Sequence, residues 1–81
     1  MIRLTLYTRT DCHLCDEMRA AIDEVARDVA LTMEEIDVDS APDLAATYGA
    51  EVPVLCIEGR KAFKYRVDAA TLRARLAREW R

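Results

Sequence analysis

Two cysteines separated by two residues are the part of this sequence best suited to chemistry. Cys12 and Cys15 form a C-x-x-C motif, and the third cysteine, Cys56, lies far along the chain. Residues three apart share one face of a helix, so the two thiols can close into a disulfide and open again. The same spacing also occurs in metal sites, so a zinc or iron–sulfur site is a second interpretation of the motif.

The predicted position of Cys12 at the start of a helix distinguishes the two thiols. Apolar residues from Leu14 to Val29 recur at steps of three and four, which indicates an amphipathic helix of about 17 residues beginning at His13. A thiol at a helix N-terminus lies near free backbone N–H groups and the positive end of the helix dipole, and both stabilise the thiolate. We therefore predict that Cys12 is the attacking nucleophile and that Cys15 resolves the mixed disulfide.

The rest of the chain alternates between strand-like and helix-like patterns. Period-two alternation predicts the first strand, and a nearly continuous apolar run predicts a later strand that is covered on both faces. A strand interrupted by charged residues suits the edge of a sheet. Besides the helix after Cys12, the expected elements are a strand over residues 2–8, an edge strand over 31–38, a short helix up to Tyr48, a buried strand over 52–57, a strand over 63–67 that forms a hairpin with it, and a final helix.

Capping residues predict where the last two helices begin. Ser40 is the expected N-cap of the short helix, with Pro42 in its first turn and Gly49 after its end. Asp68 is the expected N-cap of the final helix. The apolar stripe of that helix consists of Ala69, Leu72, Leu76 and Trp80, and Arg73, Arg75, Arg78 and Arg81 lie outside the stripe.

Length and composition favour one globular domain over residues 1–81 with the order βαβαββα. A chain of 9.2 kDa is too short for a second core, and 52% hydrophobic with 33% charged residues argues against disorder. The net charge of −3 does not favour nucleic acid as a partner. The charge is unevenly distributed, because residues 1–40 hold 4 basic and 10 acidic side chains, whereas residues 41–81 hold 8 basic and 5 acidic ones. We expect no membrane span and, without a secretory leader pattern, a cytoplasmic location.

The segment from Tyr7 to Cys15 resembles the active-site region of glutaredoxins and glutaredoxin-like redoxins. Val52-Pro53 resembles the cis-proline loop of that family, and the order of elements matches over essentially the whole chain. The run Cys12-His13-Leu14-Cys15, followed by Asp16-Glu17, is most similar to a group of small bacterial glutaredoxin-like proteins. The resemblance implies a thioredoxin-like α/β fold, with a four-stranded mixed sheet flanked by helices, and a thiol–disulfide oxidoreductase activity.

The resemblance also implies roles for residues outside the cysteine pair. Arg9 would bind a glutathione carboxylate or steady the thiolate, and the backbone of Val52 before Pro53 would pair with the substrate as an extra strand segment. His13 stands in place of a residue that glutaredoxins usually have between their cysteines, and we expect it to tune the reduction potential. Substrates would be disulfide-bearing proteins or glutathione, with glutathione or a thioredoxin-type reductase as the electron source.

One stretch departs from the glutaredoxin pattern. Glutaredoxins carry a glycine pair and an acidic residue before the last helix, where they hold the γ-glutamyl group of glutathione. Here the stretch over residues 63–68 contains no glycine pair. Asp68 is therefore either an acidic contact to glutathione or only a helix cap, and the dependence on glutathione is open.

Cys56 lies in the apolar run over 52–57, and free cysteine is among the most buried residue types, so we expect it in the core.

A metal held by Cys12, His13 and Cys15 would need a fourth ligand, and the adjacent Cys12 and His13 do not easily reach one tetrahedral ion. We therefore expect no bound metal or cofactor. The rival function is a non-catalytic module that binds an iron–sulfur cluster or a partner protein.

Overall fold

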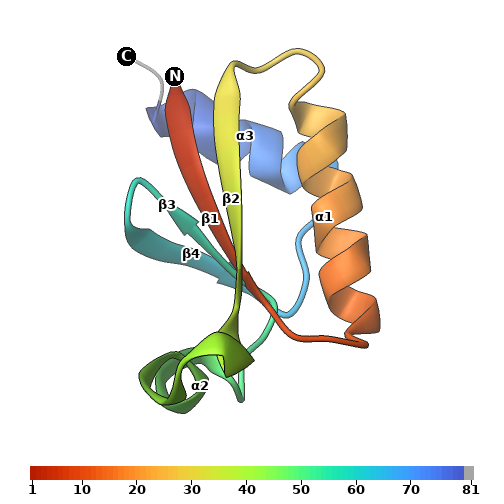
Figure 1. Cartoon of the computed structure of the whole chain (residues 1–81). Coiled ribbons are helices and arrows are strands. Elements are labelled where there is room, and N and C mark those ends of the chain that lie inside the picture. The colour runs from red at the N-terminus through yellow and green to blue at the C-terminus, as the bar shows by residue number, and fades with distance from the viewer. Residues whose placement is uncertain (80–81) are drawn as a thin grey trace.

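The computed structural model describes residues 1–79. Four strands form one mixed sheet in the order β2-β1-β3-β4 (Figure 1). β1 (Ile2–Thr8) is parallel to β2 (Leu31–Asp37). β3 (Val54–Ile57) is antiparallel to both β1 and β4 (Arg60–Lys64). The predicted four-stranded mixed sheet and the edge position of the second strand are both confirmed.

Two long helices cover one face of this sheet. α1 (His13–Val25) and α3 (Ala69–Glu79) pack against each other and against the same side of β1 and β3. Alternation along β1 directs Leu4 and Leu6 toward the helices and their neighbours to the opposite face. The buried core consists of Ile2, Leu4, Leu6, Met18, Ile22, Val25, Leu55, Ile57, Leu72 and Leu76.

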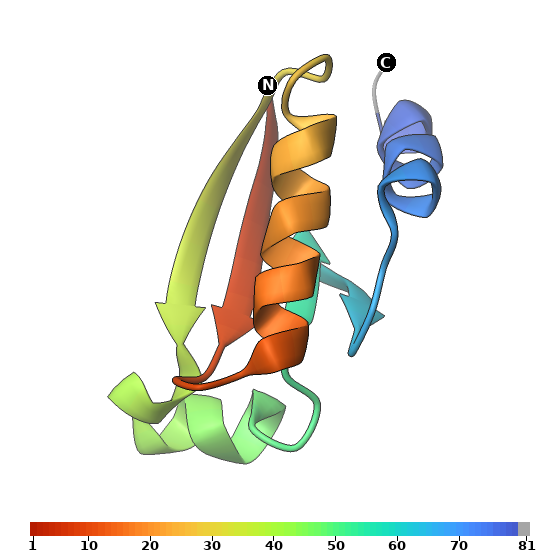
Figure 2. The ribbon, with the colours of Figure 1, turned by 90° about the vertical axis from the view of Figure 1, so that its right-hand side faces the viewer.

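The short elements lie at the end of the sheet where β1 and β2 terminate (Figure 2). They are η1 (Val38–Ser40), a single 3₁₀ turn, and α2 (Pro42–Tyr48). The ring of Tyr48 stacks on that of Tyr7 with centroids 4.0 Å apart, which joins α2 to β1. Tyr7 belongs to the β1 face opposite the core face, so α2 packs on the side of the sheet away from α1 and α3.

The first helix is shorter than its apolar pattern predicts. α1 has 13 residues and ends at Val25, so the prediction of about 17 residues was wrong. The N–H groups of Asp28 and Val29 both donate to the carbonyl of Val25, at 3.2 and 3.0 Å, and fold the chain back toward β2. Val29 still packs against the core from this turn, which is why its spacing looked helical.

The predicted cap of the short helix was also wrong. Ser40 lies inside η1, where its hydroxyl donates to the carbonyl of Asp37 at 2.6 Å. The carboxylate of Asp37 accepts the N–H of Asp39 and begins the turn three residues earlier. Ala41 stands at the N-cap position of α2 without a side-chain bond, and Pro42 begins the helix as expected.

The hairpin exists, but both of its strands differ from the predicted bounds. Glu58 and Gly59, with φ of 50° and 80°, make the turn alone, so β4 begins at Arg60 and not at residue 63. β3 begins at Val54, and all four of its residues are buried, as expected of a strand covered on both faces.

Trp80 and Arg81, expected in the final helix, lie outside the described residues. Over residues 1–79, no helix combines the length and apolar character needed to cross a membrane.

Candidate active site

Cys12 and Cys15 form a disulfide at the start of α1, with their Cα atoms 5.2 Å apart. Cys12 has extended backbone angles and occupies the N-cap, where its Sγ accepts the N–H of Cys15 at 3.1 Å. Cys12 is half-buried, whereas Cys15 is 1% exposed. Cys12 is therefore the more accessible of the two sulfurs, and the roles of nucleophile and resolving thiol stay a prediction.

The loop between β1 and α1 is tied to the short elements through Arg9. Its guanidinium donates to both carboxylate oxygens of Asp39, at 3.0 and 3.2 Å, and to the carbonyl of Gly49 at 3.2 Å. A Cβ atom on Gly49 would overlap the backbone carbonyl oxygen of Ala45, so this position requires glycine, whereas the nearby Nη2 of Arg9 ends a flexible side chain that could shift. The role of Arg9 as an anion or thiolate contact stays a prediction, and the structure shows that its guanidinium is already paired.

A hollow with an excess of carboxylates lies next to Cys12. Arg19 donates to the carboxylate of Glu35 at 2.7 and 2.6 Å and to that of Asp16 at 2.7 Å, and Thr8 donates to Glu35 at 3.2 Å. These bonds join the first turn of α1 to β2, and the Arg19 guanidinium holds the pKa of Glu35 below its usual value. The charged residues lining the hollow are Arg9, Asp11, Asp16, Arg19, Glu35 and Asp37.

His13 is the first residue of α1 and projects into solvent. Its side chain is 89% exposed, and its Nε2 lies 3.6 Å from a carboxylate oxygen of Glu17 one turn further along the helix. Its influence on the reduction potential stays a prediction.

The Val52–Pro53 peptide bond is cis, as the resemblance to the proline loop implied. Pro53 is buried and Val52 is half-buried. Because Val54 pairs with Tyr7 near the end of β1, this loop lies at the same end of the sheet as the chain leading to Cys12 (Figures 1 and 2).

A third segment, between β4 and α3, lies beside the proline loop. The N–H of Tyr65 donates to the carbonyl of Pro53 at 2.9 Å. Asp68 accepts the N–H of Thr71 at 2.7 Å, which confirms its capping role, and this bond lowers its pKa. Its predicted contact with glutathione is untested. Sequence reasoning did not single out Tyr65, although the missing glycine pair was the signal that this stretch differs.

Cys56 lies in a different environment. It is 5% exposed in β3, on the face of the sheet opposite Leu55, and burial raises the pKa of its thiol. The prediction that Cys56 belongs to the buried interior is confirmed. Within residues 1–79, no group of three or more His, Cys, Asp or Glu side chains is placed to hold a metal ion.

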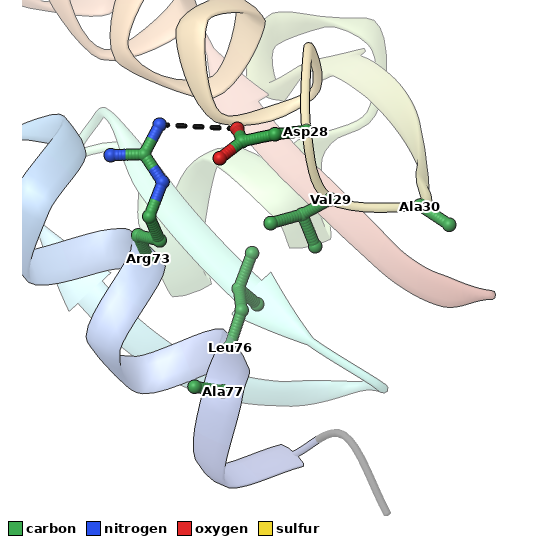
Figure 3. A pocket seen from close by; sticks show the side chains of 6 residues that line it. All are labelled: Asp28, Val29, Ala30, Arg73, Leu76 and Ala77. Carbon is green, nitrogen blue, oxygen red and sulfur yellow. Dashed lines mark hydrogen bonds and ion pairs between the residues drawn. The ribbon is translucent and has the colours of Figure 1, made fainter.

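A second hollow lies at the opposite end of α1, about 20 Å from the disulfide by the helical rise of its 13 residues (Figure 3). Arg73 and Asp28 face each other across it and pair at 3.2 Å. The other residues lining it are Val29, Ala30, Leu76 and Ala77. Its charged groups are paired with each other, and its distance from Cys12 separates it from the thiol chemistry.

Comparison with known proteins agrees with this geometry. A family model described as Glutaredoxin-like domain (DUF836) matches residues 3–77. The uncharacterized protein Rv0508 of Mycobacterium tuberculosis is 33% identical in a match that covers 94% of this chain and 84% of that protein.

Two solved structures bear on the fold. Structural genomics target protein XcR50 from X. campestris is 41% identical, with a TM-score of 0.76 over 93% of this chain and 96% of that one. Chloroplastic thioredoxin z is 19% identical, with a TM-score of 0.77 over 96% of this chain and 77% of that one. The expected thioredoxin-like α/β fold is thereby confirmed.

Proposed function

The chain belongs to the family of the glutaredoxin-like domain (DUF836), and on that premise we propose that it is a thiol–disulfide oxidoreductase acting through Cys12 and Cys15. One observation carries the proposal: the two sulfurs are bonded at a helix start, with Cys12 accessible and Cys15 buried behind it. A pair arranged in this way can exchange its disulfide with a substrate through one exposed sulfur.

The reaction begins from the reduced protein. The Cys12 thiolate attacks one sulfur of a substrate disulfide, so the substrate S–S bond breaks, one substrate thiolate leaves and a mixed disulfide forms on Cys12. The Cys15 thiolate then attacks Sγ of Cys12 and releases the second substrate thiolate. Two electrons pass to the substrate, whose two sulfurs take up the protons released by the dithiol, and the protein is left with the Cys12–Cys15 disulfide.

The local geometry supports these roles. In the reduced protein, the N–H of Cys15 and the other free N–H groups of the first turn can stabilise a thiolate on Cys12. Stabilising the thiolate raises the fraction of the nucleophilic form near neutral pH. The backbone of Val52, next to the buried Pro53, lies at the same end of the sheet, and we expect it to hold an extended segment of the substrate.

Either glutathione or a thioredoxin-type reductase would return two electrons and two protons to the disulfide. Glutathione carries carboxylates, yet Arg9 and Arg19, the two cations lining the hollow beside Cys12, are already paired with carboxylates of the protein. This arrangement favours a protein reductase. A reducing compartment such as the cytoplasm would keep the protein in the direction of substrate reduction.

Equilibration with mixtures of reduced and oxidised glutathione, followed by alkylation and mass spectrometry, tests the proposal. We expect Cys12 and Cys15 to interconvert reversibly between dithiol and disulfide while Cys56 stays reduced. The Cys15→Ser variant should accumulate a mixed disulfide on Cys12. A pair that never closes under any ratio would overturn the oxidoreductase function and leave a binding module as the remaining function of this site.

A further inference from the structure

Tyr65 is a large hydrophobic side chain left exposed next to the candidate active site. Among residues 1–79, the large hydrophobic side chains that are exposed are Met1, at the chain end, and Tyr65, at 44%. Tyr65 follows the last residue of β4, and its N–H binds the carbonyl of Pro53. The backbone that carries the ring is therefore hydrogen-bonded directly to the proline loop.

The backbone at Tyr65 has a conformation that an aromatic residue rarely adopts. Its φ is 69°, and the N–H of Arg66 donates to the carbonyl of Lys64 at 2.8 Å. A three-residue turn with a positive φ at its centre is uncommon and strained, and glycine adopts it with far less strain. Residues held in strained backbone conformations cluster at active sites and ligand-binding sites.

Ion pairs hold the surroundings of the ring in place. Glu51, two residues before Pro53, accepts hydrogen bonds from Lys61 and Lys64, the latter at 3.0 Å. The same Nζ of Lys64 lies 5.5 Å from the centroid of the Tyr65 ring. One ammonium group thus connects the segment before the proline loop to the ring, while the backbone N–H of Tyr65 connects the same residue to Pro53.

We infer that Tyr65 determines substrate specificity by packing its ring against the polypeptide that flanks the substrate cysteine. This inference rests on the proposed oxidoreductase function and names its substrate class. Disulfides within a polypeptide that carries apolar side chains next to the cysteine would be favoured over small disulfides, which have no flanking chain to contact the ring. The ring takes no part in the sulfur exchange itself.

Three disulfides of increasing size test this inference with the reduced protein. They are 2-hydroxyethyl disulfide and the symmetric disulfides of two peptides, Gly-Gly-Cys-Gly-Gly and Gly-Leu-Cys-Leu-Gly. We expect the parent protein to reduce the leucine peptide about fivefold faster than the glycine peptide, a difference within the range of a single aromatic contact. The Tyr65→Gly variant should lose that preference while reducing 2-hydroxyethyl disulfide at the parent rate.

Matched variants separate binding from folding. Tyr65→Phe keeps the ring and should keep the preference. Glycine suits the positive φ, so Tyr65→Gly should melt no lower than the parent protein. Tyr65→Asn, which also tolerates this backbone, serves as a second variant without the ring.

The outcomes distinguish the two proposals. A Tyr65→Gly or Tyr65→Asn variant that still prefers the leucine peptide overturns the role of Tyr65. Equal parent rates on both peptides overturn it as well, because no contact with the flanking chain then exists. A parent protein that reduces none of the three disulfides contradicts the proposed oxidoreductase function instead.

Discussion

The starts of α1 and α3 use the same hydrogen bond for different purposes. In α1, Sγ of Cys12 accepts the N–H of Cys15, three residues on, at 3.1 Å. In α3, the carboxylate of Asp68 accepts the N–H of Thr71, again three residues on, at 2.7 Å. Each side chain occupies the position from which it can satisfy a free donor of the first turn.

The difference lies in what the capping atom can do besides capping. A carboxylate is a strong acceptor that the bond holds ionised, and the pKa of Asp68 is lowered accordingly. A thiol caps weakly, but once ionised at a helix start it is a nucleophile. α1 therefore has a reactive residue where α3 has a stabilising one, and ion pairs from Arg19 to Asp16 and Glu35 brace its first turn from outside.

Replacing the reactive cap should have the largest effect. Cys12→Ser should reduce the rate of exchange with 2-hydroxyethyl disulfide to the uncatalysed background, because the nucleophile is lost. Serine is a preferred N-cap, so the reduced variant should be at least as stable as the reduced parent in thermal melts. A variant that retains exchange would show that Cys12 is not the attacking sulfur and would end the functional contrast between the two helix starts.

A comparison of thiols tests whether the helix start, and not cysteine itself, confers reactivity. In the fully reduced protein at pH 7, iodoacetamide should modify Cys12 at least about tenfold faster than Cys56, since a thiolate is favoured at a helix start and disfavoured by burial. Mass spectrometry of timed samples measures both rates. Comparable rates would mean that the start of α1 does not activate its thiol.

Removing the stabilising cap should affect stability and leave exchange intact. Asp68→Ala should lower the free energy of unfolding in urea titrations, and Asp68→Asn, which keeps an acceptor, should retain most of the parent stability. Both variants should exchange with 2-hydroxyethyl disulfide as the parent does. If Asp68→Asn keeps its stability but loses turnover with glutathione as reductant, the carboxylate is a glutathione contact as well as a cap.

Acid should lower the free energy of unfolding through both helix starts, and this effect should be smaller than those of the substitutions above. The pKa values of Glu35 and Asp68 are lower in the folded protein than in the unfolded chain, so each contributes stability above the unfolded value that is lost as pH falls through the folded one. The free energy of unfolding should therefore decline as pH falls below about 4.5. Glu35→Gln should flatten this decline, and hydrogen exchange should locate the difference in α1. An unchanged slope would show that Glu35 does not brace α1.

Local sequence patterns were sufficient to predict whether a segment forms a helix or a strand, but not where the helix or strand ends. Alternation in β1 and the apolar run of β3 each depend on which faces are buried, and the structure confirms both. Val29 shows the limit, because an apolar residue that packs on the core from a turn has the same spacing as one in a helix. Ser40 shows another, since Asp37 offers an acceptor three residues earlier and begins a turn there.

By itself, the sequence determined the cysteine pair, its place at a helix start and the cap at Asp68, because each depends on residues close together in the chain. The cis-proline loop was implied by the resemblance to glutaredoxins. Tertiary structure alone decided that Arg9 pairs with Asp39, 30 residues away, and that Arg19 pairs with Glu35. It also decided that Tyr65 lies beside Pro53. These contacts follow from strand order and register, which bring distant residues to one end of the sheet and have no signature in local spacing.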